Sequence, residues 1–158
     1  MNKEPDALDN NANVDDSVEA LDALLRDHAE RAVERAKDKM GGVLTEGTLP
    51  VFLMDGDCLR CPTTLTYSDD GLAENQFAEP VFQGSEEQLT CTLQIATRFE
   101  PHPQYLPLFV AYMAPVINYG QLADLALCEH YGASLLGLET DEYYKQLCDA
   151  FDSVSPAT

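Results

Sequence analysis

The clearest pattern of apolar and polar positions in the chain lies between Gln88 and Phe99. Odd positions in this stretch are mostly apolar and even positions mostly polar: Leu89, Cys91, Leu93, Ile95 and Phe99 against Thr90, Thr92, Gln94 and Arg98. A strand with one buried face and one solvated face produces this period of two. We therefore expect a strand whose odd-numbered side chains enter the core.

Three shorter apolar segments precede this stretch, at Leu49–Met54, Leu59–Tyr67 and Phe77–Phe82. They are separated by turn-forming residues, Asp55-Gly56-Asp57 after the first and Asp69-Asp70-Gly71 after the second. Pro80 has no amide hydrogen for a ladder, which favours an edge position for the third segment. Together the four segments predict an antiparallel β-meander of about four strands.

Helical spacing is clear near the N-terminus. Apolar residues recur there at intervals of three and four: Val18, Leu21, Leu25, Ala29, Ala32, Ala36 and Met40. That spacing places them on one helix face. Asp16 with Glu19 three residues later has the form of a capping box, and Gly41 supplies a left-handed residue to end the helix. We predict one amphipathic helix over this stretch.

Three further helices are expected after Phe99. Pro107 suits the first turn of the first helix, which is apolar almost all round. Asn118 can cap a second helix that ends at Gly137, and Thr140 can cap a third. The fold class is therefore α+β, with an N-terminal helix, the meander, and three C-terminal helices packing on one sheet face.

Length and composition predict one domain. Residues 1–14 are rich in Asn and Asp with few apolar side chains, so we expect a mobile acidic tail there. Residues 15–155 are long enough to bury a core of their own as a single α+β domain.

Charge is the outlying property of the chain. It contains 28 acidic and 9 basic residues, for a net charge of -19. Such a field repels nucleic acid and anionic membranes and attracts basic proteins, including proteins that bind nucleic acid. The plainer alternative is that the acidity serves only solubility.

The expected location is the cytoplasm. The N-terminus is acidic and polar, without the apolar segment of a signal peptide. The longest apolar run, Tyr105 to Ile117, is short for a membrane span and contains two prolines. Five cysteines in irregular spacing fit a reducing compartment better than a disulfide framework.

Cys58 and Cys61 form the sharpest local motif, C-x-x-C. Two cysteines at this spacing suit half of a zinc site, for which Cys128 and His130 are the compact candidates for the other half, or a redox dithiol. The alternative is burial, with Cys61 beside Leu59 in the core. No nucleotide-binding, serine-hydrolase or H-E-x-x-H motif occurs, so the sequence favours no enzyme class.

The leading functional hypothesis is a small non-enzymatic binding protein of the inhibitor, immunity or nucleic-acid-mimic type. Carboxylates would take the place of phosphates on a basic partner. Eight acids on the predicted last helix and around the predicted sheet are the candidates: Asp69, Asp70, Glu86, Glu87, Asp141, Glu142, Asp149 and Asp152. The alternative hypothesis is a metal-binding or thiol-redox protein using Cys58 and Cys61.

Three tyrosines suggest a further surface. Tyr105, Tyr112 and Tyr119 recur every seven residues, so they would share a helix face. Tyrosine is enriched at interfaces, and a second copy of the chain is the simplest partner for such a face. Such a stripe is more often part of a core, with its hydroxyls at the rim.

Overall fold

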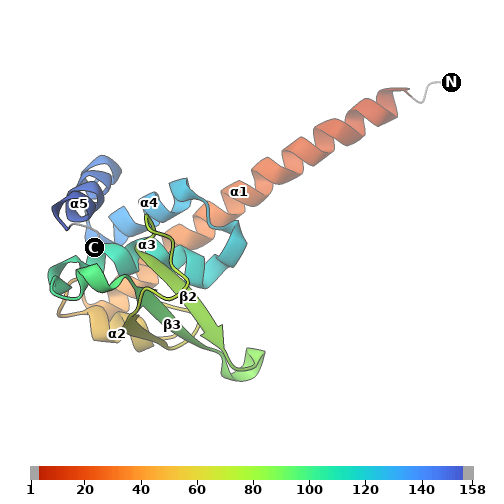
Figure 1. Cartoon of the computed structure of the whole chain (residues 1–158). Helices are drawn as coiled ribbons and strands as arrows, with labels where there is room; N and C mark the ends of the chain where they lie inside the picture. The colour runs from red at the N-terminus through yellow and green to blue at the C-terminus, as the bar shows by residue number, and fades with distance from the viewer. Residues whose placement is uncertain (1–3, 155–158) are drawn as a thin grey trace.

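The α+β class is confirmed by the computed structural model, which describes residues 4–154 (Figure 1). Its helices and strands follow in this order: α1 (Glu4–Met40), α2 (Leu49–Met54), β1 (Thr63–Tyr67), β2 (Ala78–Gln83), β3 (Thr90–Ile95), α3 (Leu106–Tyr119), α4 (Leu125–Leu136) and α5 (Thr140–Ser153). Four short 3-10 turns join them: η1 (Glu86–Gln88), η2 (Thr97–Phe99), η3 (Pro103–Tyr105) and η4 (Gly120–Leu122).

The sheet differs from the predicted antiparallel meander of about four strands. It has three strands in the order β1-β3-β2, with β1 parallel and β2 antiparallel to β3. The predicted turn at Asp69 does not close a hairpin, because the connection it begins carries the chain past the end of β3 to its other side. Gln94 on β3 holds this connection, since its side-chain amide donates to the carbonyls of Ser68 (2.9 Å) and Asp70.

The missing fourth strand is a helix. Leu49–Met54 forms α2, in which Leu49 and Phe52 are buried three residues apart on one face. A six-residue apolar run fits a buried strand and a helix equally well, so periodicity alone does not decide between them. Pro50 in the first turn favours the helix, because its fixed φ is already helical.

The buried face of β3 is confirmed. Cys91, Leu93 and Ile95 are buried, and Phe99 follows them into the core from η2. The face predicted to be wet is only partly so, because the connection after β1 covers Gln94. Arg98 lies beyond the end of the strand, in η2.

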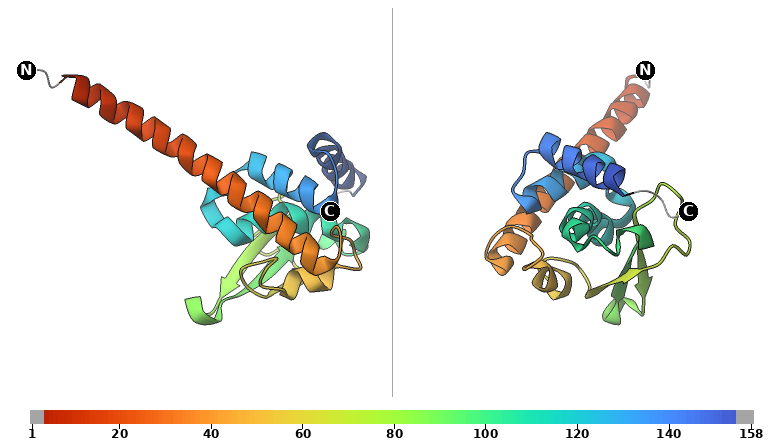
Figure 2. Two further views of the ribbon diagram at one scale, coloured as in Figure 1. Left: turned by 180° about the vertical axis from the view of Figure 1, so that it is seen from behind. Right: turned by 60° about the vertical axis from the view of Figure 1, so that its left-hand side comes forward.

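The prediction that all three C-terminal helices pack on one face of the sheet is wrong. Helix α3 contacts β2, α4 packs on α3, and α5 packs mainly on α4 and α3 (Figure 2). The predicted start of α4 is also wrong, because Asp124 rather than Asn118 caps it by accepting from the amide of Leu127 (2.8 Å). Its end at Gly137 is as predicted, whereas Glu139 occupies the cap position of α5 that was predicted for Thr140, and Thr140 is the first helical residue.

Helix α1 extends well beyond the body of the protein (Figure 1). It begins at Glu4 rather than near Asp16, and only its second half packs, with Ala29, Ala32 and Ala36 buried. The first three residues of the predicted tail lie outside the described residues, and the mobility of residues 4–14 remains a prediction. None of the described helices is both long and apolar enough to cross a membrane.

Helices α4 and α5 approach closely at Gly132. A Cβ at this position would lie 2.5 Å from two ring carbons and the hydroxyl oxygen of Tyr143. The ring has no room to move, because Tyr143 is fully buried and its hydroxyl donates to the carbonyl of Leu108 at 2.7 Å. We expect Gly132→Ala to lower the free energy of unfolding by about 1–3 kcal/mol, although alanine is the better helix former. Urea denaturation followed by circular dichroism measures the change.

The matched background for this test is Tyr143→Leu, which removes the ring that the new methyl group would strike. Gly132→Ala should cost less stability in that background than in the natural one. Equal losses in the two backgrounds would show that the contact with Tyr143 is not the cause.

Candidate functional site

Cys58 and Cys61 lie in the connection between α2 and β1, and both are buried. Burial, with smaller contributions from the charges of Asp55 and Asp57, raises the pKa of the Cys58 thiol from 9.0 to about 11. Burial also raises the pKa of Cys61. Reactive dithiols have lowered pKa values, so these two side chains have the properties of core thiols at neutral pH.

The other two predicted zinc ligands lie on α4. Cys128 is buried there, whereas His130 is exposed, with its Nε2 4.0 Å from a carboxylate oxygen of Glu30. Within the described part of the chain, no three His, Cys, Asp or Glu side chains gather closely enough to hold a metal ion. The zinc site at Cys58, Cys61, Cys128 and His130 therefore stays a prediction.

All eight acids predicted to bind a partner are exposed. Helix α5 carries four of them, Asp141, Glu142, Asp149 and Asp152, and η1 carries Glu86 and Glu87. The connection after β1 carries Asp69 and Asp70. None of them forms an ion pair with another described residue. Asp69 has a structural role as well, because its carboxylate accepts bonds from the amide (2.9 Å) and hydroxyl (2.6 Å) of Thr97.

The three tyrosines are partly buried and make contacts within the chain. The hydroxyls of Tyr105 and Tyr119 hydrogen-bond Ser153 Oγ (2.9 Å) and His28 Nδ1 (2.8 Å). Tyr112 packs edge-on against Phe77, and burial raises its pKa to about 12. These contacts match the core alternative described for the stripe, and a dimer through this face stays a prediction.

The surface that the sequence did not reveal is on α1. We name Val18, Leu21 and Leu24 the α1 strip, because they lie three residues apart and remain 59%, 54% and 66% exposed. Val18 and Leu21 belong to the single apolar face that the sequence predicts for this helix. Their spacing shows that they share a face, but it does not show that α1 runs past the elements that could cover them.

Two more exposed leucines lie at the end of the body from which α1 emerges. Leu122 in η4 and Leu125 at the start of α4 are 56% and 71% exposed. The bond between His28 and Tyr119 joins α1 to the end of α3, directly before η4, and the views from behind show this arrangement (Figure 2). Apolar side chains are thus left uncovered on both α1 and the adjoining body.

Two acidic side chains lie beside the α1 strip. Glu19 and Asp22 are exposed there, and the exposed base Arg26 follows four residues after Asp22. Asp27 is engaged with Arg31, four residues on, at 2.9 Å. The strip combines large apolar side chains with an acidic rim, which is the composition of a protein-binding surface.

Thiol labelling separates the core interpretation of Cys58 from the redox alternative. A pKa of about 11 in place of 9.0 leaves about a hundredfold less thiolate at neutral pH. We expect iodoacetamide to modify Cys58 at least about a hundredfold more slowly in the folded protein than in urea, with the difference narrowing as pH approaches 11. Mass spectrometry of peptides measures each rate.

Cys148 is the internal control, because it is only partly buried on α5 and should react first in the same folded sample. Rapid modification of Cys58 at pH 7 would contradict the core interpretation and favour a reactive dithiol.

The chain was compared with known proteins in three ways. No protein-family model, no curated protein and no solved structure matches it. Function therefore has to be argued from the residues and geometry of this chain.

Proposed function

We propose that this protein is a non-enzymatic binding module that engages a basic protein partner through the α1 strip and its acidic rim. The observation that carries the proposal is the uncovered apolar surface on the protruding half of α1. An inhibitor, an immunity protein and a mimic of nucleic acid all act in this way, by occupying a basic groove on another protein. The proposal assigns no catalytic step to the chain.

The apolar residues supply the anchor. Interfaces gain most of their affinity from a few well-packed side chains near the centre, surrounded by contacts that exclude water. Val18, Leu21 and Leu24 are such apolar side chains on α1, and Leu122 in η4 is a further exposed one on the body. Leaving such side chains in water is unfavourable, so a partner that covers them gains free energy.

Charge selects the kind of partner. The chain has a net charge of -19, and Glu19 and Asp22 place negative charge directly beside the anchor. A second copy of the chain would bring the same carboxylates together, which opposes association. A partner that presents lysines or arginines around an apolar centre complements both features, and its arrival is accelerated by the long-range field.

Substitution of the strip tests the anchor. We expect Leu21→Gln with Leu24→Gln to reduce capture of the basic partner from native lysate by at least about tenfold, since each lost anchor weakens binding by about 1 kcal/mol or more. Folding stability should change by less than about 0.5 kcal/mol for each substitution, because both side chains are exposed. Capture is quantified by mass spectrometry.

The matched control is Val51→Gln with Met54→Gln, which removes two exposed apolar side chains from α2 instead. This pair should leave capture unchanged. Equal losses from the two pairs would mean that general surface apolarity, rather than the α1 strip, drives binding. Light scattering measures whether the chain forms a dimer. If it does, and if Leu21→Gln with Leu24→Gln converts the dimer to a monomer, then the strip binds a second copy of the chain and the proposal of a basic partner is overturned.

Neutralising acids tests the rim. Glu19→Gln with Asp22→Asn should weaken capture at low salt and flatten its decline between about 0.05 and 0.5 M NaCl, because screening acts on the charges that were removed. Glu86→Gln with Glu87→Gln, on η1, should keep the full salt dependence. If the η1 pair flattens the salt dependence and the α1 pair does not, the partner binds near η1 and the proposed rim is wrong.

A further inference from the structure

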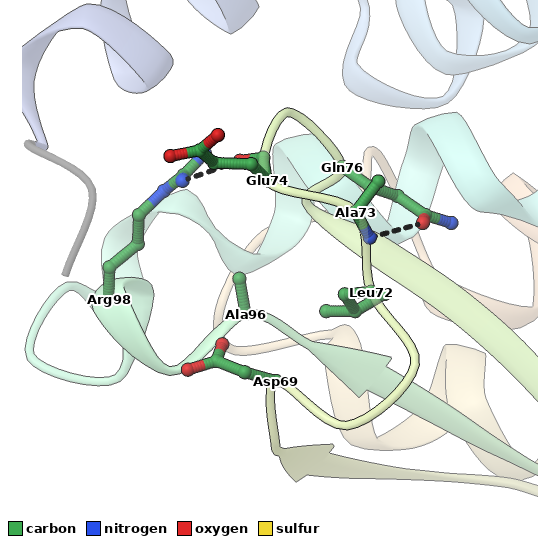
Figure 3. Close-up of a pocket in the computed structure, with 7 residues that line it drawn as sticks. All are labelled: Asp69, Leu72, Ala73, Glu74, Gln76, Ala96 and Arg98. Atoms are coloured by element: carbon green, nitrogen blue, oxygen red, sulfur yellow. Dashed lines mark hydrogen bonds between the residues drawn. The ribbon is translucent and has the colours of Figure 1, made fainter.

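A second region has the form of a small-molecule site. The connection from β1 to β2 borders an open cavity of about 130 Å³ that is lined by seven residues, Asp69, Leu72, Ala73, Glu74, Gln76, Ala96 and Arg98 (Figure 3). An adjoining hollow of about 530 Å³ shares Glu74 and Arg98 and reaches Asn75, Phe151 and Val154. Hollows of this combined size accept small organic ligands.

Arg98 is held firmly between the two hollows. The centre of its guanidinium group lies 4.8 Å from the ring centroid of Phe99 and 4.9 Å from that of Phe151. Its Nη1 donates to the carbonyl of Glu74 at 3.2 Å, so the side chain reaches from η2 to the opposite wall of the cavity (Figure 3). A planar cation held in this way is already oriented before any ligand arrives.

One nitrogen of the Arg98 guanidinium nevertheless lacks a hydrogen-bond acceptor in the part of the chain that the structure describes. Its Nε is buried and meets no acceptor among the described residues, and no carboxylate of that part of the chain forms an ion pair with it. Stacking on a ring does not by itself leave the Nε of an arginine without an acceptor, as Arg60 shows. Arg60 lies over Phe82 at 4.7 Å, and its Nε donates to the carbonyl of Ile117.

The other lining residues define what ligand would suit the guanidinium. Asp69 is ionised, because its bonds from Thr97 lower its pKa, and Glu74 adds a second carboxyl group. The two acids repel any anion, and they repel a doubly charged phosphate about twice as strongly as a singly charged carboxylate. Phe151 and Val154 offer an apolar wall beside Arg98, so a single negative charge attached to an apolar body fits best.

We propose that Arg98 binds the carboxylate of a small monocarboxylate whose apolar body lies against Phe151 and Val154. The carboxylate would accept from the guanidinium edge that Nη1 leaves unused, in the fork geometry that favours arginine over lysine. This site uses none of the α1 strip residues, so it stands or falls separately from the binding of a protein partner.

The test uses the full chain and two probes that differ only in charge, 3-phenylpropionate and 3-phenylpropionamide. We expect the carboxylate to shift the NMR signal of the Arg98 Nε–Hε group and to bind at least about tenfold more tightly than the amide. Equal binding of the two probes, or no binding of the carboxylate at about 10 mM, would overturn the proposal without any variant. Tighter binding of inorganic phosphate would overturn it as well.

Substitutions then place the site. Arg98→Lys keeps the positive charge but removes the fork, and it should weaken 3-phenylpropionate by at least about tenfold. The matched control is Arg60→Lys, which changes a second ring-stacked arginine on another part of the chain and should leave binding unchanged. Unchanged binding in Arg98→Lys would overturn the assignment.

Discussion

Helix α3 has almost no polar face, and the rest of the fold keeps it out of water. Phe109, Val110 and Ala111 are all fully buried. Successive residues of a helix point about 100° apart, so the helix must be covered on several sides at once. The rings of Phe77 and Phe99 pack on Phe109 from the sheet side, and α4 covers another side. The fold is therefore layered around α3 rather than around the sheet.

The parts of this fold that could be predicted are those decided by local patterns. Alternation in β3 and the left-handed residue Gly137 at the end of α4 depend on neighbours within a few residues. Strand order could not be predicted in this way. It depends on Gln94 holding carbonyls of Ser68 and Asp70, a contact between segments more than twenty residues apart.

The same distinction applies to the candidate sites. Composition correctly located exposed acids, but Val18 and Leu21 follow the same spacing as Ala29 and Ala32, which are buried. Their exposure differs because of where α4 begins along α1, and only the folded structure shows that position. The arginines differ in a similar way, because only the folded chain shows which guanidinium has an acceptor for its Nε.

The order of strands in the sheet also has a consequence for how the chain is made. β3 is the central strand but the last of the three in the sequence, and β1 and β2 do not pair with each other. During synthesis, both therefore emerge before any neighbour exists to complete their ladders. The buried face of α1 around Ala29 and Ala36 stays uncovered for longer, because α1 packs on α4, which follows β3 in the sequence. Neither strand can complete its pairing until β3 has been made, and the α1 face that packs on α4 cannot be covered until the chain through α4 has been made.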